Sequence, residues 1–335
     1  MTMKKRIEWL DFGRGFTIFL VVVAHVLGGI YTNNIYSQSV NDVLSPLGET
    51  VFLVIMPIFF SLSGYVYRDP RDRTDYFKIM TKKMINLFVP YAIFSSLYIY
   101  MQKIGGVNEY DWGSLLLIWY KPISYLWFLY VLFFIFVLVS GLSLIGISKK
   151  VQLVLYLIGF VFVQIEGLNY YIFQTFGWAI FFIIGIFLKR NECLLNKKVV
   201  VSSFVVFVVM LIVMFTTLGT DHRYYNELLI VNLIPKVFSD IFLLGVYLNS
   251  SPTTWFFRYF KKYGRYSLII YLIHPPVISV ARTIILKLAS VNVVVLIALL
   301  ILAGWYVSIF VVFLNKKIPY LNYIFNPYSM IRRVN

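Results

Sequence analysis

The sequence predicts an all-α fold: a polytopic integral membrane helical bundle of about ten transmembrane helices, with the N-terminus and the C-terminus cytoplasmic. Two observations predict the bundle. The chain is 60% hydrophobic and only 13% charged, with a mean hydropathy of +0.82, which is too little polar surface for a water-soluble domain of this size. Its apolar residues also form successive runs of roughly 17 to 25, the length that crosses the hydrocarbon layer as a helix.

The expected spans follow one another from end to end, and the fifth is the shortest. They are 9–30, 46–66, 85–103, 123–146, 151–166, 172–189, 199–219, 228–249, 266–287 and 292–314. The loops between them are brief, and the longest outer loops are 31–45 and 104–122. We therefore expect a single transmembrane domain over 1–335 with no attached soluble catalytic domain, so that any chemistry takes place within or beside the bundle.

The third observation, the distribution of basic residues, predicts the orientation. A net charge of +16 could suggest nucleic acid. When the spans are threaded from a cytoplasmic N-terminus, however, most of the 30 Lys and Arg lie on the cytoplasmic side. Only Lys103, Lys121, Arg223 and Lys287 lie on the outer side, in an outer loop or at the outer end of a span. This is the positive-inside pattern, so we expect membrane lipid and no nucleic acid as a partner.

The single cysteine and the N-terminal segment bear on disulfides, metal binding and targeting. The only cysteine, Cys193, lies in a short basic loop, so neither a disulfide framework nor a thiolate metal site is expected, and we expect no metal. The N-terminus has the basic start of a signal peptide, but Asp11 and Arg14 interrupt its apolar stretch. We interpret this stretch as a retained first span.

Three polar residues of the first span are the most informative in the chain, because ionisable groups inside a span are costly. Asp11, Arg14 and His25 lie on one face of a helix. His25 is about 20° in azimuth from Arg14 and about 40° from Asp11, and it lies about 16 Å further along the helix than Arg14. Asp11 and Arg14 could be an interfacial ion pair and His25 a packing residue. Their alignment favours a functional stripe, since imidazole suits proton transfer near neutral pH.

The cytoplasmic loop before the third span is strongly basic. The segment RDPRDRTDYFKIMTKK, from Arg68 to Lys83, holds six basic residues. Such runs often only determine topology. Four of its side chains would nevertheless suit the phosphates of a cytoplasmic cofactor: Arg71, Arg73, Lys82 and Lys83.

Two further features of the spans are weaker. Lys236 and Asp240, at i and i+4, are expected to neutralise each other as a structural pair. His274 precedes Pro275 and Pro276, so it could cap a kink, or serve as a second polar functional residue inside the membrane.

The outer end of the fourth span is rich in aromatic residues, which indicate either an interfacial belt or a surface that stacks on sugars. They are Trp119, Tyr120, Tyr125 and Trp127. The chain has no HExxH, GxSxG, Walker or GxGxxG pattern that would support a familiar soluble chemistry.

Five segments, in order, resemble the type 3 membrane acyltransferases. The first is EWLDFGRGFTIFLVVVAH (Glu8 to His25), with an Asp, an Arg-Gly and a His eleven residues after the Arg. The others are MPIFFSLSGYVYR (Met56 to Arg68), KKMINLFVPY (Lys82 to Tyr91), YLWFLYVLF (Tyr125 to Phe133) and YSLIIYLIHPPV (Tyr266 to Val277). Each segment alone is weak, but five in the right order are specific, and the resemblance extends over the whole chain.

The resemblance implies an activity and its site. Such enzymes move an acyl group, usually acetyl from cytoplasmic acetyl-CoA, to a hydroxyl of an extracytoplasmic glycan or lipid-linked sugar. The short loops look most like bacterial sugar and exopolysaccharide O-acetyltransferases of the plasma membrane. His25 then matches the essential histidine, and Asp11 and Arg14 match the polar pair before it. Asn86 stands where an Arg is common, which shifts the expected phosphate contacts to Lys82, Lys83 and the loop arginines. A homo-oligomer is compatible with the sequence.

A mechanism follows from this interpretation. The CoA phosphates would bind the basic loop and the pantetheine arm would run beside the first span, which brings the thioester to His25. That ring would act as general base or briefly carry the acetyl group. Tyr65, Trp127 and His274 would contact the acceptor. The alternative is a transporter or flippase of a glycan or small molecule. A polysaccharide polymerase is disfavoured because its long outer loop is absent.

Overall fold

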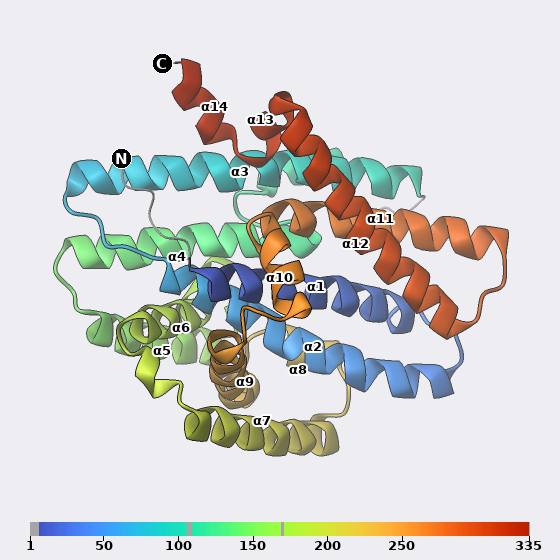
Figure 1. The fold of residues 1–335 in the computed structure, drawn as a ribbon, viewed down its shortest axis with the longest axis horizontal. Coiled ribbons are helices and arrows are strands. Elements are labelled where there is room, and N and C mark those ends of the chain that lie inside the picture. The colour runs from blue at the N-terminus through green and yellow to red at the C-terminus, as the bar shows by residue number, and fades with distance from the viewer. Residues whose placement is uncertain (1–6, 106–108, 169–170, 335) are drawn as a thin grey trace. The chain divides into compact units, whose positions relative to one another are not determined.

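The computed structural model describes residues 7–105, 109–168 and 171–334. Every regular element among these residues is a helix, so the expected all-α fold is confirmed (Figure 1). The α-helices are α1 (Glu8–Tyr31), α2 (Gln38–Tyr65), α3 (Arg73–Ile104), α4 (Trp127–Leu144), α5 (Lys149–Ile165), α6 (Tyr171–Arg190), α7 (Lys197–Leu218), α8 (His222–Asn226), α9 (Ile230–Asn249), α10 (Trp255–Gly264), α11 (Ser267–Leu288), α12 (Val293–Lys317), α13 (Asn322–Phe325) and α14 (Pro327–Val334). Short 3-10 helices are η1 (Trp112–Leu117), η2 (Ser124–Leu126), η3 (Glu192–Leu194) and η4 (Pro319–Leu321).

Within the described ranges, nine helices are long and apolar enough to cross a membrane. They are α1, α2, α3, α4 with the preceding η2, α6, α7, α9, α11 and α12. The expected fifth span, 151–166, forms α5, which has 17 residues. The chain is thus a multi-pass membrane helical bundle. Both termini can lie on the same side only if the number of crossings is even, so the predicted cytoplasmic location of both ends requires α5 to cross as well.

The chain divides into two compact units, and the first comprises the described residues of 1–65 and 185–312. In this unit α1 packs against both α2 and α10, and α7 packs against α9. Glycine makes the α1–α10 crossing close. A Cβ on Gly15 would lie 2.7 Å from the carbonyl carbon of Phe260, and one on Gly264 would lie 2.6 Å from that of Asp11. The two backbones therefore touch at the end of α1 that carries Asp11.

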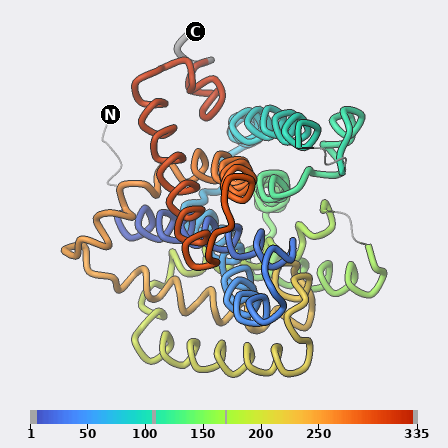
Figure 2. Tube along the Cα trace, turned by 90° about the vertical axis from the view of Figure 1, so that its right-hand side faces the viewer, coloured from blue at the N-terminus to red at the C-terminus, as the bar shows by residue number. Residues whose placement is uncertain are grey.

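The second unit comprises the described residues of 66–184 and 313–334. Here α3 and α4 lie side by side in both views (Figures 1 and 2). The last helix returns to α3, where the Tyr328 N–H donates to Oδ1 of Asn86 at 3.0 Å. The 66–72 loop is held to α5 by an ion pair of 2.7 Å between Lys149 Nζ and Asp69 Oδ1. Asn86, which departs from the common Arg, thus has a structural partner in the C-terminal segment.

Candidate active site

His25 projects from α1 toward two neighbouring helices of the same unit. Its ring centroid lies 5.1 Å from that of His274 on α11 and 5.8 Å from that of Phe52 on α2. His274 is fully buried and Phe52 is 6% exposed. The imidazole of His25 therefore packs against buried side chains of α2 and α11, and the structure brings together two histidines that the sequence suggested separately.

His274 also has a local partner that defines its tautomer. Its Nδ1 lies 2.8 Å from the carbonyl oxygen of Ile270, four residues earlier in α11. A carbonyl oxygen only accepts, so Nδ1 carries the hydrogen and Nε2 of the neutral ring is an acceptor. The ring is thus bonded to a backbone carbonyl of its own helix just before Pro275 and Pro276 and also lies beside His25, and whether His274 has a structural or a functional role stays a prediction.

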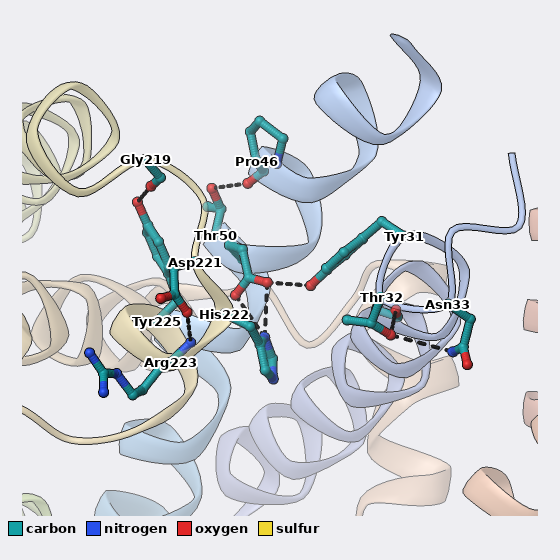
Figure 3. A network of polar contacts seen from close by, with 12 residues as sticks. Tyr31, Thr32, Asn33, Pro46, Thr50, Gly219, Asp221, His222, Arg223 and Tyr225 are labelled. Carbon is teal, nitrogen blue, oxygen red and sulfur yellow. Dashed lines mark hydrogen bonds and ion pairs between the residues drawn. The ribbon is translucent and has the colours of Figure 1, made fainter. Parts of the chain in front are cut away.

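The third histidine of the chain completes the cluster. His222 Nδ1 lies 2.8 Å from Oε1 and 2.9 Å from Oε2 of Glu49, and the Tyr31 hydroxyl donates to Oε1 of the same carboxylate. Figure 3 shows Tyr31 and His222 approaching this carboxylate from different sides. The ring of His222 meets Phe52 edge to face at 4.5 Å, so the imidazoles of His25 and His222 flank one phenyl ring.

Sequence reasoning missed Glu49, His222 and Tyr31. Glu49 carried a usable signal, because it lies inside the expected span 46–66, where an ionisable residue is a functional hypothesis by default. His222 carried none, since it lies in a polar loop between Asp221 and Arg223 and its partner is 173 residues away.

Asp11 and Arg14 lie on the same helix as His25, but nearer its N-terminus. Both are half-buried. Arg14 Nη2 is 3.4 Å from the Leu62 carbonyl oxygen of α2, and the backbone of Asp11 packs on Gly264. The rise of α1 separates Arg14 from His25 by about 16 Å. The pairing of Asp11 with Arg14 stays a prediction.

The expected pair of Lys236 and Asp240 is wrong. Although both side chains are fully buried on α9, Lys236 Nζ donates to the Tyr225 carbonyl oxygen at 2.5 Å. Asp240 Oδ2 instead accepts from Ser61 Oγ on α2 at 2.5 Å. Each side chain therefore bonds to a different neighbouring segment rather than to the other one on α9.

The four basic residues expected to bind phosphate belong to the second unit. Three are exposed: Arg71, Arg73 and Lys82. Lys83 is half-buried, and its Nζ lies 3.6 Å from the ring centroid of Phe136, a close cation–π contact. The exposed groups are accessible to a polyanion, whereas Lys83 is held in place by its aromatic neighbour.

Tyr65 and Trp127 lie elsewhere. Tyr65 is at the C-terminal end of α2, where its hydroxyl donates to Glu192. It is roughly 24 Å along the helix axis from Glu49. Trp127 belongs to the second unit, and its ring is 5.5 Å from that of Trp178. The structure thus does not bring Tyr65 into the histidine cluster, and the roles of Tyr65 and Trp127 in acceptor binding stay predictions.

In the described ranges no group of three or more His, Cys, Asp and Glu could hold a metal ion.

Comparison with known proteins decides the family. Residues 7–314 match the acyltransferase domain of the type 3 acyltransferases. The chain belongs to this family. It is also 30% identical over 87 residues to the nodulation protein NolL of Sinorhizobium fredii (strain NBRC 101917 / NGR234). That similarity covers 26% of this chain and 23% of NolL, so the chain matches about a quarter of that relative. No solved structure matches. Together with its apolar helices, this match makes the protein a multi-pass membrane member of the type 3 acyltransferase family.

Proposed function

We propose that this acyltransferase is an O-acetyltransferase of the bacterial plasma membrane. It moves an acetyl group from cytoplasmic acetyl-CoA to a hydroxyl of an extracytoplasmic glycan, such as a capsular polysaccharide, an exopolysaccharide or a cell-wall sugar. The observation that carries the proposal is the position of His25, which lies beside the buried His274 inside the bundle of an acyltransferase. Imidazole is the side chain best suited to moving a proton near neutral pH.

The reaction joins the acceptor oxygen to the acetyl carbonyl carbon. In one course, the acceptor hydroxyl loses its proton to imidazole as its oxygen attacks the thioester, and the C–S bond breaks. In the other, the His25 nitrogen first takes the acetyl group and the hydroxyl then attacks the acyl-imidazole. Both courses yield the acetyl ester and free CoA thiol.

The donor would be bound through its phosphates. Arg71 and Arg73 offer forked hydrogen bonds to phosphate oxygens, Lys82 offers an exposed charge, and Lys83 offers a charge held over Phe136. The stretch of α1 from Arg14 to His25, about 16 Å, is comparable to an extended pantetheine arm. Tyr65, Trp127 and His274 are the proposed contacts of the glycan.

The first test is the replacement of His25. Membrane vesicles from cells that carry the gene are given [14C]acetyl-CoA, and both ester-linked label in glycan and released CoA thiol are measured. His25→Ala should abolish the label while the amount of protein in the membrane stays the same. Val23→Ala, a truncation of a half-buried neighbour on α1, is the control and should stay active. A fully active His25→Ala protein would refute the proposal, and a transporter would release no CoA thiol.

The second test addresses the donor contacts. Replacing Arg71 and Arg73 together by Gln should raise the KM for acetyl-CoA and leave kcat nearly unchanged, because exposed charges contribute binding that is the same in the ground and transition states. The increase should shrink at high salt. Lys287→Gln, which removes a charge from the predicted outer side, is the matched control. An unchanged KM in the double variant would remove both arginines from the donor site.

A further inference from the structure

We infer that His222, oriented by Glu49, is the base that takes the proton of the acceptor hydroxyl, so that His25 acts on the acetyl group. This inference rests on the proposed function and divides between two rings the tasks that one imidazole would otherwise perform. It starts from the contact of His222 Nδ1 with both carboxylate oxygens of Glu49, at 2.8 and 2.9 Å.

That contact defines which nitrogen can act. A carboxylate only accepts hydrogen bonds, so the Nδ1 of His222 carries a hydrogen and Nε2 of the neutral ring is the basic nitrogen. A base whose second nitrogen is held by a carboxylate is the arrangement that acyl-transfer enzymes on unrelated folds use. The carboxylate keeps the ring in one tautomer and stabilises the imidazolium that forms.

The carboxylate is itself fixed from two sides. Glu49 has no exposed surface, and a buried carboxylate is tolerated only when hydrogen bonds compensate its lost hydration. Besides His222, it accepts from the Tyr31 hydroxyl at the end of α1 (Figure 3). Tyr31 and Glu49 therefore form a rigid support for the imidazole rather than a mobile surface pair.

The short helix that carries His222 is also anchored. Asn232 Nδ2 donates to the Tyr224 carbonyl oxygen at 2.5 Å, and the buried Lys236 donates to that of Tyr225. The Tyr225 hydroxyl in turn donates to the Gly219 carbonyl oxygen at 2.6 Å. These bonds hold α8 before any substrate binds, as a preorganised site requires.

Access distinguishes this pair from a purely structural one. The His222 side chain is 37% exposed, whereas Glu49 is fully buried. The imidazole can therefore meet a ligand on its open side while its other side is held. His25 and His222 contact the same Phe52 ring, so both imidazoles belong to one group of side chains around Phe52, and we assign the acceptor to its His222 side and the acetyl group to its His25 side.

The step balances without a further reactant. Nε2 of His222 takes the hydroxyl proton as the acceptor oxygen bonds to the acetyl carbonyl carbon. The bond from that carbon to its leaving group breaks, and the leaving group is the CoA sulfur, or the His25 nitrogen if the acetyl group was transferred there first. The thiolate and the imidazolium then exchange one proton through solvent, which leaves ester, CoA thiol and neutral His222.

The experiment uses the full-length protein in membrane vesicles with [14C]acetyl-CoA, and the acceptor is the glycan of those vesicles. His222→Asn places an amide N–H where Nδ1 lies and no atom where Nε2 lies, so it retains the bond to Glu49 and loses the base. We expect it to keep the wild-type unfolding midpoint and the wild-type KM for acetyl-CoA, and to form glycan ester at least ~10²-fold more slowly. His222→Ala should lose as much, and added imidazole should restore its activity.

Two results would overturn the inference: His222→Asn that keeps more than a third of wild-type ester formation, or His222→Ala that imidazole does not rescue. His25→Ala in the same assay separates the two levels of the argument. If it is inactive while the His222 variants are active, the second base is refuted and the acetyltransferase stands. If it is fully active, the proposed function itself fails.

Discussion

A single methyl group at the crossing of α1 and α10 should destabilise the first unit. In Gly15→Ala the new Cβ would lie inside the contact distance of the Phe260 backbone, 2.7 Å from its carbonyl carbon and 3.1 Å from the amide nitrogen of Gly264. The neighbouring atoms are backbone, so no side chain can rotate away. The two helices must separate.

The size of the effect follows from this distance. The Phe260 carbonyl oxygen is the atom nearest to the new Cβ, and even the carbonyl carbon behind it must retreat by about 0.7 Å to reach the 3.4 Å of an ordinary contact. The retreat disturbs the stacked rings of Phe12 and Phe257, whose centroids are 4.6 Å apart. Overpacking costs about 1 to 3 kcal/mol, and a clash between two backbones belongs at the upper end, about 2 to 3 kcal/mol, against about 1 kcal/mol gained by removing a helical glycine. We expect a net loss of roughly 1 to 2 kcal/mol.

The assay is unfolding of the purified protein in lipid and detergent, followed as a function of temperature or SDS. Gly141→Ala is the matched control, because it lies inside α4 and its new Cβ would find only the Tyr76 hydroxyl, 3.9 Å away. It should be neutral or slightly more stable than the wild type. If Gly15→Ala unfolds at the same midpoint as Gly141→Ala, the close crossing and the reasoning from it are wrong.

Two further predictions concern polar contacts between different segments of the chain. Ser61→Ala removes the hydroxyl that donates to the buried Asp240 and should lower stability by about 1 kcal/mol or more in the same assay, whereas Ser308→Ala, which loses only a bond to its own helix at Gly304, should be nearly neutral. The second concerns pH. Partial burial raises the pKa of Asp69, but the hydrogen bond and charge of Lys149 outweigh it and hold this pKa below the ordinary 3.8. A carboxyl group whose pKa is lower in the folded than in the unfolded state stabilises the fold at pH values above its unfolded pKa, and this contribution is lost as the pH falls through its folded pKa. The unfolding midpoint of the wild type should therefore decrease when the pH is lowered below about 3.8. An equal decrease in Lys149→Met would contradict the assignment.

The predictable part of this protein is the part set by solvent and by local geometry. When lipid surrounds an apolar run, its backbone N–H and C=O groups must hydrogen-bond to one another within one helix. Hydropathy alone therefore located α1, α2 and most of the other long helices. The alignment of Asp11, Arg14 and His25 was equally local, because the helical repeat defines which residues share a face. Even α5, the shortest of the expected spans, is a helix where one was expected.

Partnerships between helices were beyond the sequence. Lys236 and Asp240 had the correct spacing for a pair, yet their partners belong to α8 and α2, since a side chain that can reach several neighbours bonds to whichever the packing brings nearest. His274 beside His25, and Glu49 joined to His222 and Tyr31, depend in the same way on how helices far apart in the chain pack. Period and hydropathy describe one helix at a time, and so they determine that a polar group lies in the membrane, whereas only the tertiary structure decides which other polar group it meets.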